Sequence, residues 1–343
     1  MWQFTSEKIE VPEDISEINR FFVEKGWSDG LPVIPPTEGR VLSLLHGTDR
    51  KPDEIIAHIP PKWAEATVEK VAINAVMAGC FPEHMPIIFA AVEAIAEERF
   101  NLYGIQATTH PCGVLLIVNG PTRKNLGINC SYGAFGPGTL ANAVIGRAIR
   151  LILMNIGGAV PGRVDKSTLG QPGKFTYLIG ENEEENPWEP LSVERGFSPE
   201  QSTVTVVGAE GPHDVHDRSS MSATGILTTM AGTLACQGNN NMLWQLGEPV
   251  VVLCPEHART IVRDGFTKND VKEFLFQRAK LPKSAFSKED QDQRYANLPE
   301  DALISIARKP EDIIVIVAGG LGKHSAVIPT FGITLSVTHR IEK

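Results

Sequence analysis

The chain has 343 residues, of which 42% are hydrophobic and 21% charged, an ordinary composition for a globular protein. This length is comfortable for two lobes and long for a single compact core. The formal net charge of −9 argues against general nucleic-acid binding, because that function needs a basic surface to displace counterions from phosphates. An acidic protein can still bind a small anion at a local site. The net charge therefore limits the macromolecular partners but not the substrates.

The distribution of apolar residues and cysteines predicts a cytoplasmic protein that does not enter a membrane. No uncharged apolar run reaches membrane-spanning length, since the nearest, 151–160, is short and contains Asn155. Residues 1–12 lack the apolar stretch of a signal peptide. The cysteines are widely spaced, odd in number and without a C-x-x-C pair, so a secreted disulfide framework is not expected. They are Cys80, Cys112, Cys130, Cys236 and Cys254.

The first part of the chain reads as helices joined by an extended segment. Helical spacing of apolar residues predicts a helix over 16–25, which ends at a glycine. Residues 26–37 are rich in proline and predict an extended loop. Two further helices are expected over 66–78 and 84–98. We therefore predict an N-terminal region over 1–65, followed by a first α/β lobe over 66–200.

Two strands of the middle region are followed by similar sequences. The continuous apolar run 113–118 predicts a strand buried on both faces, followed by Asn-Gly-Pro, a polar loop and a helix over 140–155. The run 202–207 predicts another strand, followed by Glu-Gly-Pro, a polar loop and a helix over 221–235. The shared order suggests an internal duplication of a strand–Gly-Pro–loop–helix unit.

The last third predicts a further strand–helix–strand unit within a second α/β lobe over 201–343. A strand over 249–253 leads into a helix that Pro255 opens, and Thr267 caps the next helix. A charged surface excursion follows before a strand over 312–318. Strands that alternate with helices predict an α/β or α+β fold, with a layered, mostly parallel sheet flanked by helices.

The loop after the strand at 202–207 predicts a metal site. His213, His216 and Asp217 supply nitrogen and oxygen ligands suited to Zn²⁺, Fe²⁺ or Mn²⁺, and a helical turn would bring the two histidines together. His110, before the first buried strand, is a further candidate ligand or base. His-Asp pairs are also common in caps and turns, so a structural role for this loop stays open.

Two other loops carry candidate catalytic groups. Cys80 would have a lowered thiol pKa if it capped the helix that follows, and Glu83 would lie in that helix's first turn. A buried structural cysteine is the alternative. Lys323 and His324, in a glycine-rich loop after the last predicted strand, are candidate acids, bases or electrostatic stabilisers, or else members of a solvated turn.

Amide and guanidinium groups are the candidate substrate ligands. Asn119 ends the first buried strand. Asn239 and Asn240 follow the helix predicted over 221–235, where they suit a cap or a polar ligand. Arg147 lies on an apolar helix, where it is suited to hold a carboxylate or phosphate, or to pair with an internal acid. The acidic run 181–185 is interpreted mainly as solvated surface. Neither a G-x-S-x-G elbow nor a G-x-G-x-x-G motif in the required context is present.

Three segments carry a resemblance to a known family. They are 26–37 (GWSDGLPVIPPT), 77–86 (MAGCFPEHMP) and 182–190 (NEEENPWEP). These segments resemble a poorly characterised bacterial family that occurs alone or beside the domain of UGSC-type (seleno)proteins. The chain lacks the tetrad itself, so the thiol or selenol chemistry associated with it is not carried over. The resemblance implies a metabolic enzyme, or an enzyme component, that acts on a small molecule.

Three functional hypotheses follow. The leading hypothesis is a metal-dependent lyase or hydrolase that acts on a small-molecule substrate at the strand-end loops. The second is a metal-free cysteine enzyme that uses Cys80. The third is a non-catalytic ligand-binding or assembly subunit that works with a partner chain. A homo-oligomer is expected, because this state is common among cytoplasmic enzymes.

Overall fold

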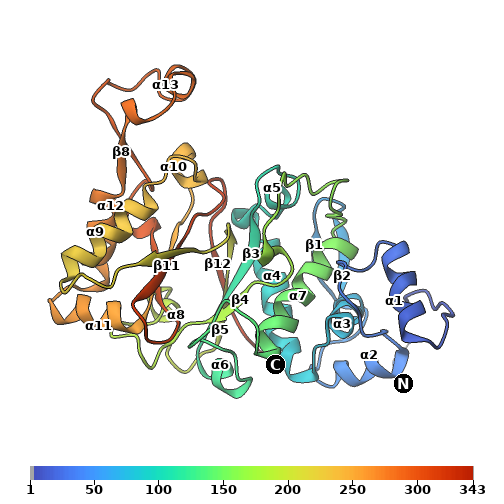
Figure 1. Ribbon diagram of the computed structural model, residues 1–343. Coiled ribbons are helices and arrows are strands. Elements are labelled where there is room, and N and C mark those ends of the chain that lie inside the picture. The colour runs from blue at the N-terminus through green and yellow to red at the C-terminus, as the bar shows by residue number, and fades with distance from the viewer. Residues whose placement is uncertain (1–3, 343) are drawn as a thin grey trace.

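Two four-stranded sheets pack face to face in the centre of the molecule, and helices cover the outer face of each (Figure 1). The computed structural model describes residues 4–342. The first sheet has the order β12–β5–β3–β4 and the second β10–β7–β11–β6. The strands of the first are β3 (Gly113–Asn119), β4 (Leu178–Gly180), β5 (Thr203–Ala209) and β12 (Val337–Arg340). Those of the second are β6 (His213–His216), β7 (Val250–Leu253), β10 (Ile314–Val317) and β11 (His324–Ile328).

Strand β3 shows why its sequence is a continuous apolar run. Successive side chains of a strand point to opposite faces. Leu115 and Ile117 therefore pack between the two sheets, while Leu116 and Val118 pack against the helices on the outer face. All seven residues of the strand are buried, which confirms the predicted strand with two buried faces.

The helices outside the first sheet share one core with the N-terminal region. They are α3 (Val68–Ala78), α4 (Met85–Ala96) and α7 (Leu140–Asn155). The N-terminal region contains α1 (Ile15–Glu24), α2 (Glu38–Leu45), β1 (Ile55–Ile59) and β2 (Ala64–Thr67). Phe22 of α1 and Leu44 of α2 are buried in the same cluster as α3, α4 and α7. The core therefore runs across the predicted boundary at residue 65.

The outer face of the second sheet is covered by three helices. They are α9 (Ala223–Leu234), α11 (Pro255–Arg263) and α12 (Lys268–Arg278). Pro255 occupies the first position of α11, as predicted. Thr267 and Asp270 form the predicted capping box of α12, in which each side chain accepts a hydrogen bond from the other residue's backbone.

The prediction of a mostly parallel sheet is not confirmed. Among the strands of residues 4–342, only the pairs β3–β4 and β10–β7 run parallel, and the other pairings run antiparallel. The predicted duplicated unit is not confirmed either. The two predicted units begin with β3 and β5. These two strands pair with each other inside the same sheet. The supported description is a mixed α/β fold with several small sheets.

A different regularity relates the two sheets. In the first, β3 is parallel to β4 and antiparallel to β5, which in turn pairs with β12. In the second, β7 is parallel to β10 and antiparallel to β11, which pairs with β6. The first four strands of the sandwich along the chain, β3 to β6, thus place β6 in the second sheet, and the last four, β7, β10, β11 and β12, place β12 in the first. This exchange ties the two groups of strands together by backbone hydrogen bonds.

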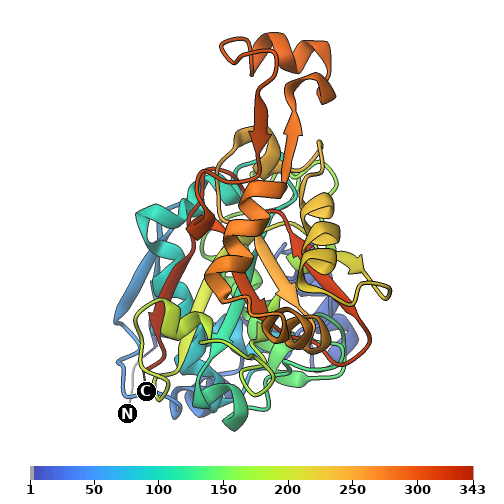
Figure 2. The same cartoon turned by 90° about the vertical axis from the view of Figure 1, so that its left-hand side faces the viewer.

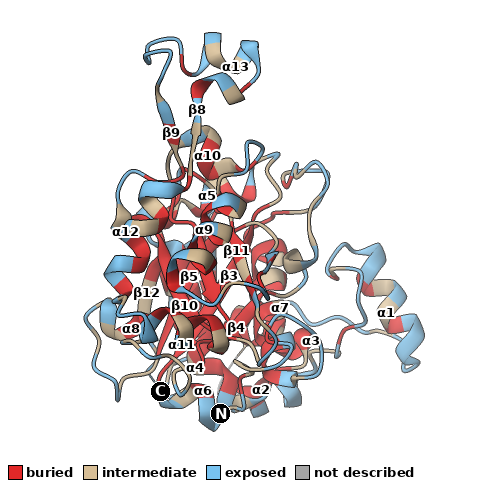
Figure 3. Cartoon of the chain, turned by 60° about the vertical axis from the view of Figure 1, so that its left-hand side comes forward, coloured by how far each residue is buried: buried red, intermediate tan, exposed pale blue. Residues whose placement is uncertain are grey.

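An arm projects from one end of the sandwich (Figures 2 and 3). It consists of β8 (Lys280–Pro282), α13 (Lys288–Gln293) and β9 (Leu303–Ser305), and it corresponds to the predicted surface excursion. Within it, Tyr295 is buried against Phe286, with ring centroids 4.9 Å apart. The short helices at the ends of the sandwich are α5 (Leu102–Gln106), α6 (Pro121–Asn125), α8 (Leu191–Glu194) and α10 (Asn240–Trp244).

Within residues 4–342, no single helix combines the length and the apolar character needed to cross a membrane. Two helical segments, 68–78 and 82–96, meet these criteria only when joined, and they bend by 120° at their junction.

Candidate functional site

The predicted site residues separate into three regions of the fold. Both parallel strand pairs end on the same side, because Asn182 donates its backbone N–H to Val317 (2.7 Å) and Gly319 donates to Cys130 (2.9 Å). Predicted residues at this carboxyl end are Asn119, His216, Asp217, Lys323 and His324, whereas the register places His213 level with Val251, near the start of β7. Those at the opposite end are His110, Asn239 and Asn240, and those in the outer helical layer are Cys80, Glu83 and Arg147.

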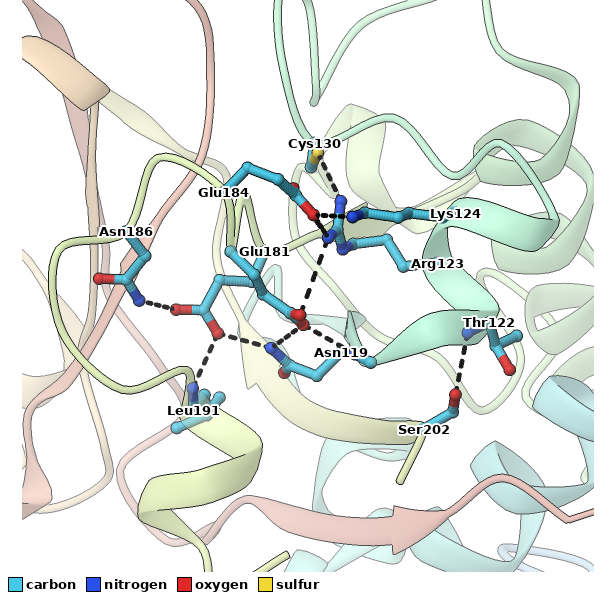
Figure 4. A network of polar contacts seen from close by, with 12 residues as sticks. Asn119, Thr122, Arg123, Lys124, Cys130, Glu181, Glu184, Asn186, Leu191 and Ser202 are labelled. Carbon is cyan, nitrogen blue, oxygen red and sulfur yellow. Dashed lines mark hydrogen bonds and ion pairs between the residues drawn. The ribbon is translucent and has the colours of Figure 1, made fainter. Parts of the chain in front are cut away.

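A buried polar network occupies the carboxyl end of β3 and β4 (Figure 4). The Asn119 side-chain amide donates to Glu181 (2.7 Å) and to Glu183 (3.0 Å). Glu181 is fully buried, and burial raises the pKa of its carboxyl group although Lys268 and Asn119 oppose this effect. The expectation that the acidic run is mainly solvated is therefore wrong for Glu181. Asn119 holds the two loops together at this point.

Arg123 extends this network toward the surface. Its guanidinium donates two hydrogen bonds to Glu184 (2.6 and 2.8 Å) and one to the Cys130 sulfur (3.2 Å). Burial would raise the pKa of the Glu184 carboxyl, but Arg123 and Lys124 hold that pKa at about 2. The carboxylates of this network are engaged by donors from the chain. We infer that this network holds the loops that follow β3 and β4 in place.

The predicted metal ligands do not form one cluster. The segment with His213 and His216 is strand β6 and not a helical turn, so residues three apart face opposite sides. Asp217 accepts hydrogen bonds from Ser220 (2.9 Å) and Thr229 (2.6 Å). Across residues 4–342, no group of three or more His, Cys, Asp or Glu side chains is arranged to hold a metal ion. Metal dependence stays a prediction.

The structure brings His324 to His216 instead. The two residues lie opposite each other on β11 and β6, and their rings stack at 4.5 Å between centroids. His324 Nδ1 also lies 3.0 Å from the carboxylate of Asp214. The neighbouring Lys323 donates its ammonium group to the Arg218 carbonyl oxygen (3.2 Å). The glycine-rich loop thus continues into strand β11, and no strand was predicted at this position.

One cluster at this end was not predicted. Ser325 Oγ accepts the backbone N–H of Cys254 (3.0 Å) and lies 2.7 Å from His257 Nδ1. Burial would raise the pKa of the Cys254 thiol, but the side chain and backbone of His257 lower it below its usual value. The Cys-Pro-x-His sequence at a helix start was the available signal. These side chains are buried and satisfied, which is typical of a structural cluster.

Cys80 lies in a setting that disfavours the thiolate. Its sulfur donates to the Val144 carbonyl oxygen (3.4 Å), and burial raises the pKa of the thiol. Phe81 and His84, rather than Cys80, occupy the N-cap positions of the helical turns that follow, so the predicted cap is wrong. Glu83 is exposed to solvent. This geometry favours the buried structural cysteine over the reactive one.

Arg147 of helix α7 forms an ion pair with the proline-rich segment 26–37. Arg147 pairs with Asp29 of that segment, so the internal acid is its partner in the structure. Trp27, Pro35 and Pro36 of the same segment line a cleft of about 560 Å³ beside α1 and α3. The motif that carries the family resemblance therefore docks onto α7 through an ion pair.

The opposite end of the sandwich joins His110 to Glu210. His110 precedes β3, and Glu210 follows β5, whose last residue pairs with the first residue of β3. His110 Nε2 lies 2.7 Å from Glu210 Oε1. The backbone N–H of Asn240 approaches the same oxygen (3.4 Å), and the neighbouring Asn239 caps α10 by accepting from Met242 (2.7 Å). Asn239 is thus a helix cap, at the start of a helix and not at its end.

Two buried nitrogens at this end have no hydrogen-bond partner among the described residues. They are His110 Nδ1 and Gln171 Nε2. The His110 ring stacks on Phe331, with 5.2 Å between centroids, and its side chain is 11% exposed. A Cβ atom on Gly113 or Gly211 would lie within 3.6 Å of the Gln171 amide, so these glycines leave room for that side chain.

A small pocket with excess positive charge adjoins this region. It has a volume of about 20 Å³, enough for about one water molecule. Arg150, Lys174 and Cys112, two residues beyond His110, contribute to its lining. Arg150 (3.2 Å) and Lys174 (2.9 Å) share the single carboxylate of Asp165, which leaves one positive charge uncompensated within this trio.

Comparison of the chain with protein-family models, curated proteins and solved structures finds no match. The resemblance to the relatives of UGSC-type proteins therefore stays a prediction. The functional argument rests on the geometry of the site alone.

Proposed function

We propose that the protein is a small-molecule hydrolase or lyase in which His110, oriented by Glu210, acts as the general base. The observation that carries this proposal is the 2.7 Å contact between His110 Nε2 and Glu210, together with a buried Nδ1 atom that has no partner among the described residues. A base whose second nitrogen is held by a carboxylate is a recurring arrangement in acid–base catalysis.

The carboxylate partner defines the tautomer of His110. A carboxylate only accepts hydrogen bonds, so the Nε2 atom carries the proton that it donates to Glu210. Nδ1 then presents a lone pair. A water molecule or an acidic C–H group placed there would transfer its proton to Nδ1, and Glu210 would stabilise the imidazolium that forms. The first case gives hydrolysis and the second gives elimination.

The neighbouring groups favour a small polar substrate with a negative charge. The unpartnered Gln171 Nε2 is a donor, and the Arg150–Lys174–Asp165 trio retains one positive charge. A buried donor or acceptor without a partner costs about 1–3 kcal/mol, so a ligand or water that satisfies either nitrogen is favoured. Five free cysteines are consistent with our proposal that the protein works in the cytoplasm.

The proposal is tested by turnover of a panel of small amides, esters and 2-hydroxy acids. Replacement of His110 by Gln should lower kcat by about 10²–10⁴ for any substrate found, because proton transfer is lost while packing is kept. Glu210→Gln should act in the same direction. His339→Gln is the matched control, since His339 also contacts a glutamate at 2.6 Å but lies on β12.

Unchanged turnover in His110→Gln would overturn the proposal. The tautomer gives a second test that needs no substrate. Nitrogen NMR of the folded protein at mildly alkaline pH should show the His110 proton on Nε2, and a proton on Nδ1 instead would contradict the assigned role.

A further inference from the structure

We propose that His216 and His324 form a binding site for a divalent transition-metal ion of the Cu²⁺, Ni²⁺ or Zn²⁺ class. The site lies at the carboxyl end, across β6 and β11, and it does not depend on the role of His110. Of the four metal ligands predicted from the sequence, it uses only His216.

The backbone pairing places the two imidazoles together. His216 and His324 are direct partners in the antiparallel register of β6 and β11. Side chains in this relation have Cβ atoms about 5 Å apart and project from the same face of the sheet. Their rings stack face to face, with 4.5 Å between centroids and 6° between the ring planes, so the exposed His216 ring turns about its side-chain bonds to point a nitrogen at an ion held by His324. Both residues are exposed, so an ion reaches them from solvent and water molecules fill its remaining positions.

Asp214 prepares His324 for this role. It lies two residues before His216, so it projects from the same face of β6, and its carboxylate is 3.0 Å from His324 Nδ1. The carboxylate accepts the Nδ1 proton, which leaves the Nε2 lone pair for the metal. A carboxylate that fixes the tautomer of a metal-binding histidine is a recurring feature of such sites. Neutral imidazole is the preferred ligand of Cu²⁺, Ni²⁺ and Zn²⁺.

The same geometry gives this ion a structural effect. β6 follows the first three strands of the other sheet along the chain, and it joins this sheet only through its pairing with β11. An ion bound to both histidines would link the exchanged strand to its neighbour. Because the ion binds the folded state through a pair of residues that unfolding separates, it should raise the unfolding temperature.

The test uses the full chain without a histidine tag and Cu²⁺ as the probe. Isothermal titration calorimetry should give one site, and electron paramagnetic resonance should show coupling to two imidazole nitrogens. His216→Ala and His324→Ala should each weaken binding by about tenfold or more, and Asp214→Asn by about tenfold. Cu²⁺ should raise the unfolding temperature of the wild type but not of either histidine variant.

His213→Ala is the matched control, because His213 lies on the same strand but on its other face. It should keep the wild-type affinity and the wild-type shift in unfolding temperature. All four substituted positions are exposed, so circular dichroism should show folded variants. Absence of binding, or equal affinities in the wild type and in every variant, would mean an adventitious ion only and would overturn the proposal.

Discussion

Arg147 and Asp29 form a two-pronged ion pair, with Nε and one Nη of the guanidinium each 2.8 Å from a carboxylate oxygen. The Asp29 side chain is only 2% exposed and that of Arg147 is 13% exposed. A third hydrogen bond from Arg147 reaches the Leu31 carbonyl oxygen (3.1 Å). The pair therefore attaches the proline-rich segment to helix α7, across 118 residues of sequence.

Loss of one member of this pair should destabilise the protein. Asp29→Ala leaves the guanidinium of Arg147 buried without its carboxylate, and we expect the free energy of unfolding to fall by about 3 kcal/mol. Urea denaturation gives the measurement. The double variant Asp29→Leu/Arg147→Met should recover part of the loss, because it leaves no uncompensated charge. A single variant as stable as the wild type would show that the segment is held by its apolar contacts alone.

Alkylation should rank the cysteines by exposure and by thiol pKa. With iodoacetamide at neutral pH, we expect Cys236 to react fastest, because it is the exposed thiol of the five. Cys80 and Cys112 should react slowly, since burial raises the pKa of both, to about 12 for Cys112. Peptide mapping by mass spectrometry reads the order. Fast labelling of Cys80 in the folded protein would contradict its structural role and restore the hypothesis of a Cys80 enzyme.

The sequence predicted the elements whose signals are local. Strand β3 and helix α7 appear where expected because each has a continuous or periodic apolar pattern and a clear end. The capping box of Thr267 and Asp270 was also predicted, since both partners lie within one helical turn. These features depend on short-range contacts, which spacing along the chain describes well.

The predictions that were wrong or missing concern features that depend on pairing between distant segments. β6 is short and polar, and it is a strand because β11, more than a hundred residues later, supplies its backbone partners. The contact between His110 and Glu210 was not predicted for the same reason, because these residues are 100 positions apart in the sequence. Spacing along the chain placed His216 with His213, whereas strand register places it with His324. Side chains at a sheet edge are assigned to a common site only when the strand order is known.

The ion pairs of His339 should make stability depend on pH. The Glu93 carboxylate, followed by that of Glu97, raises the pKa of His339 above its usual value, while burial opposes them. A raised folded-state pKa stabilises the protein fully below the unfolded-state pKa of about 6.5, and this contribution disappears as the pH rises through the folded-state value. Wild type should therefore exceed His339→Gln in free energy of unfolding at mildly acidic pH, with the difference shrinking at alkaline pH. His58→Gln, at an exposed position on β1, serves as the control, and a difference between wild type and His339→Gln that grows with pH would contradict the assignment.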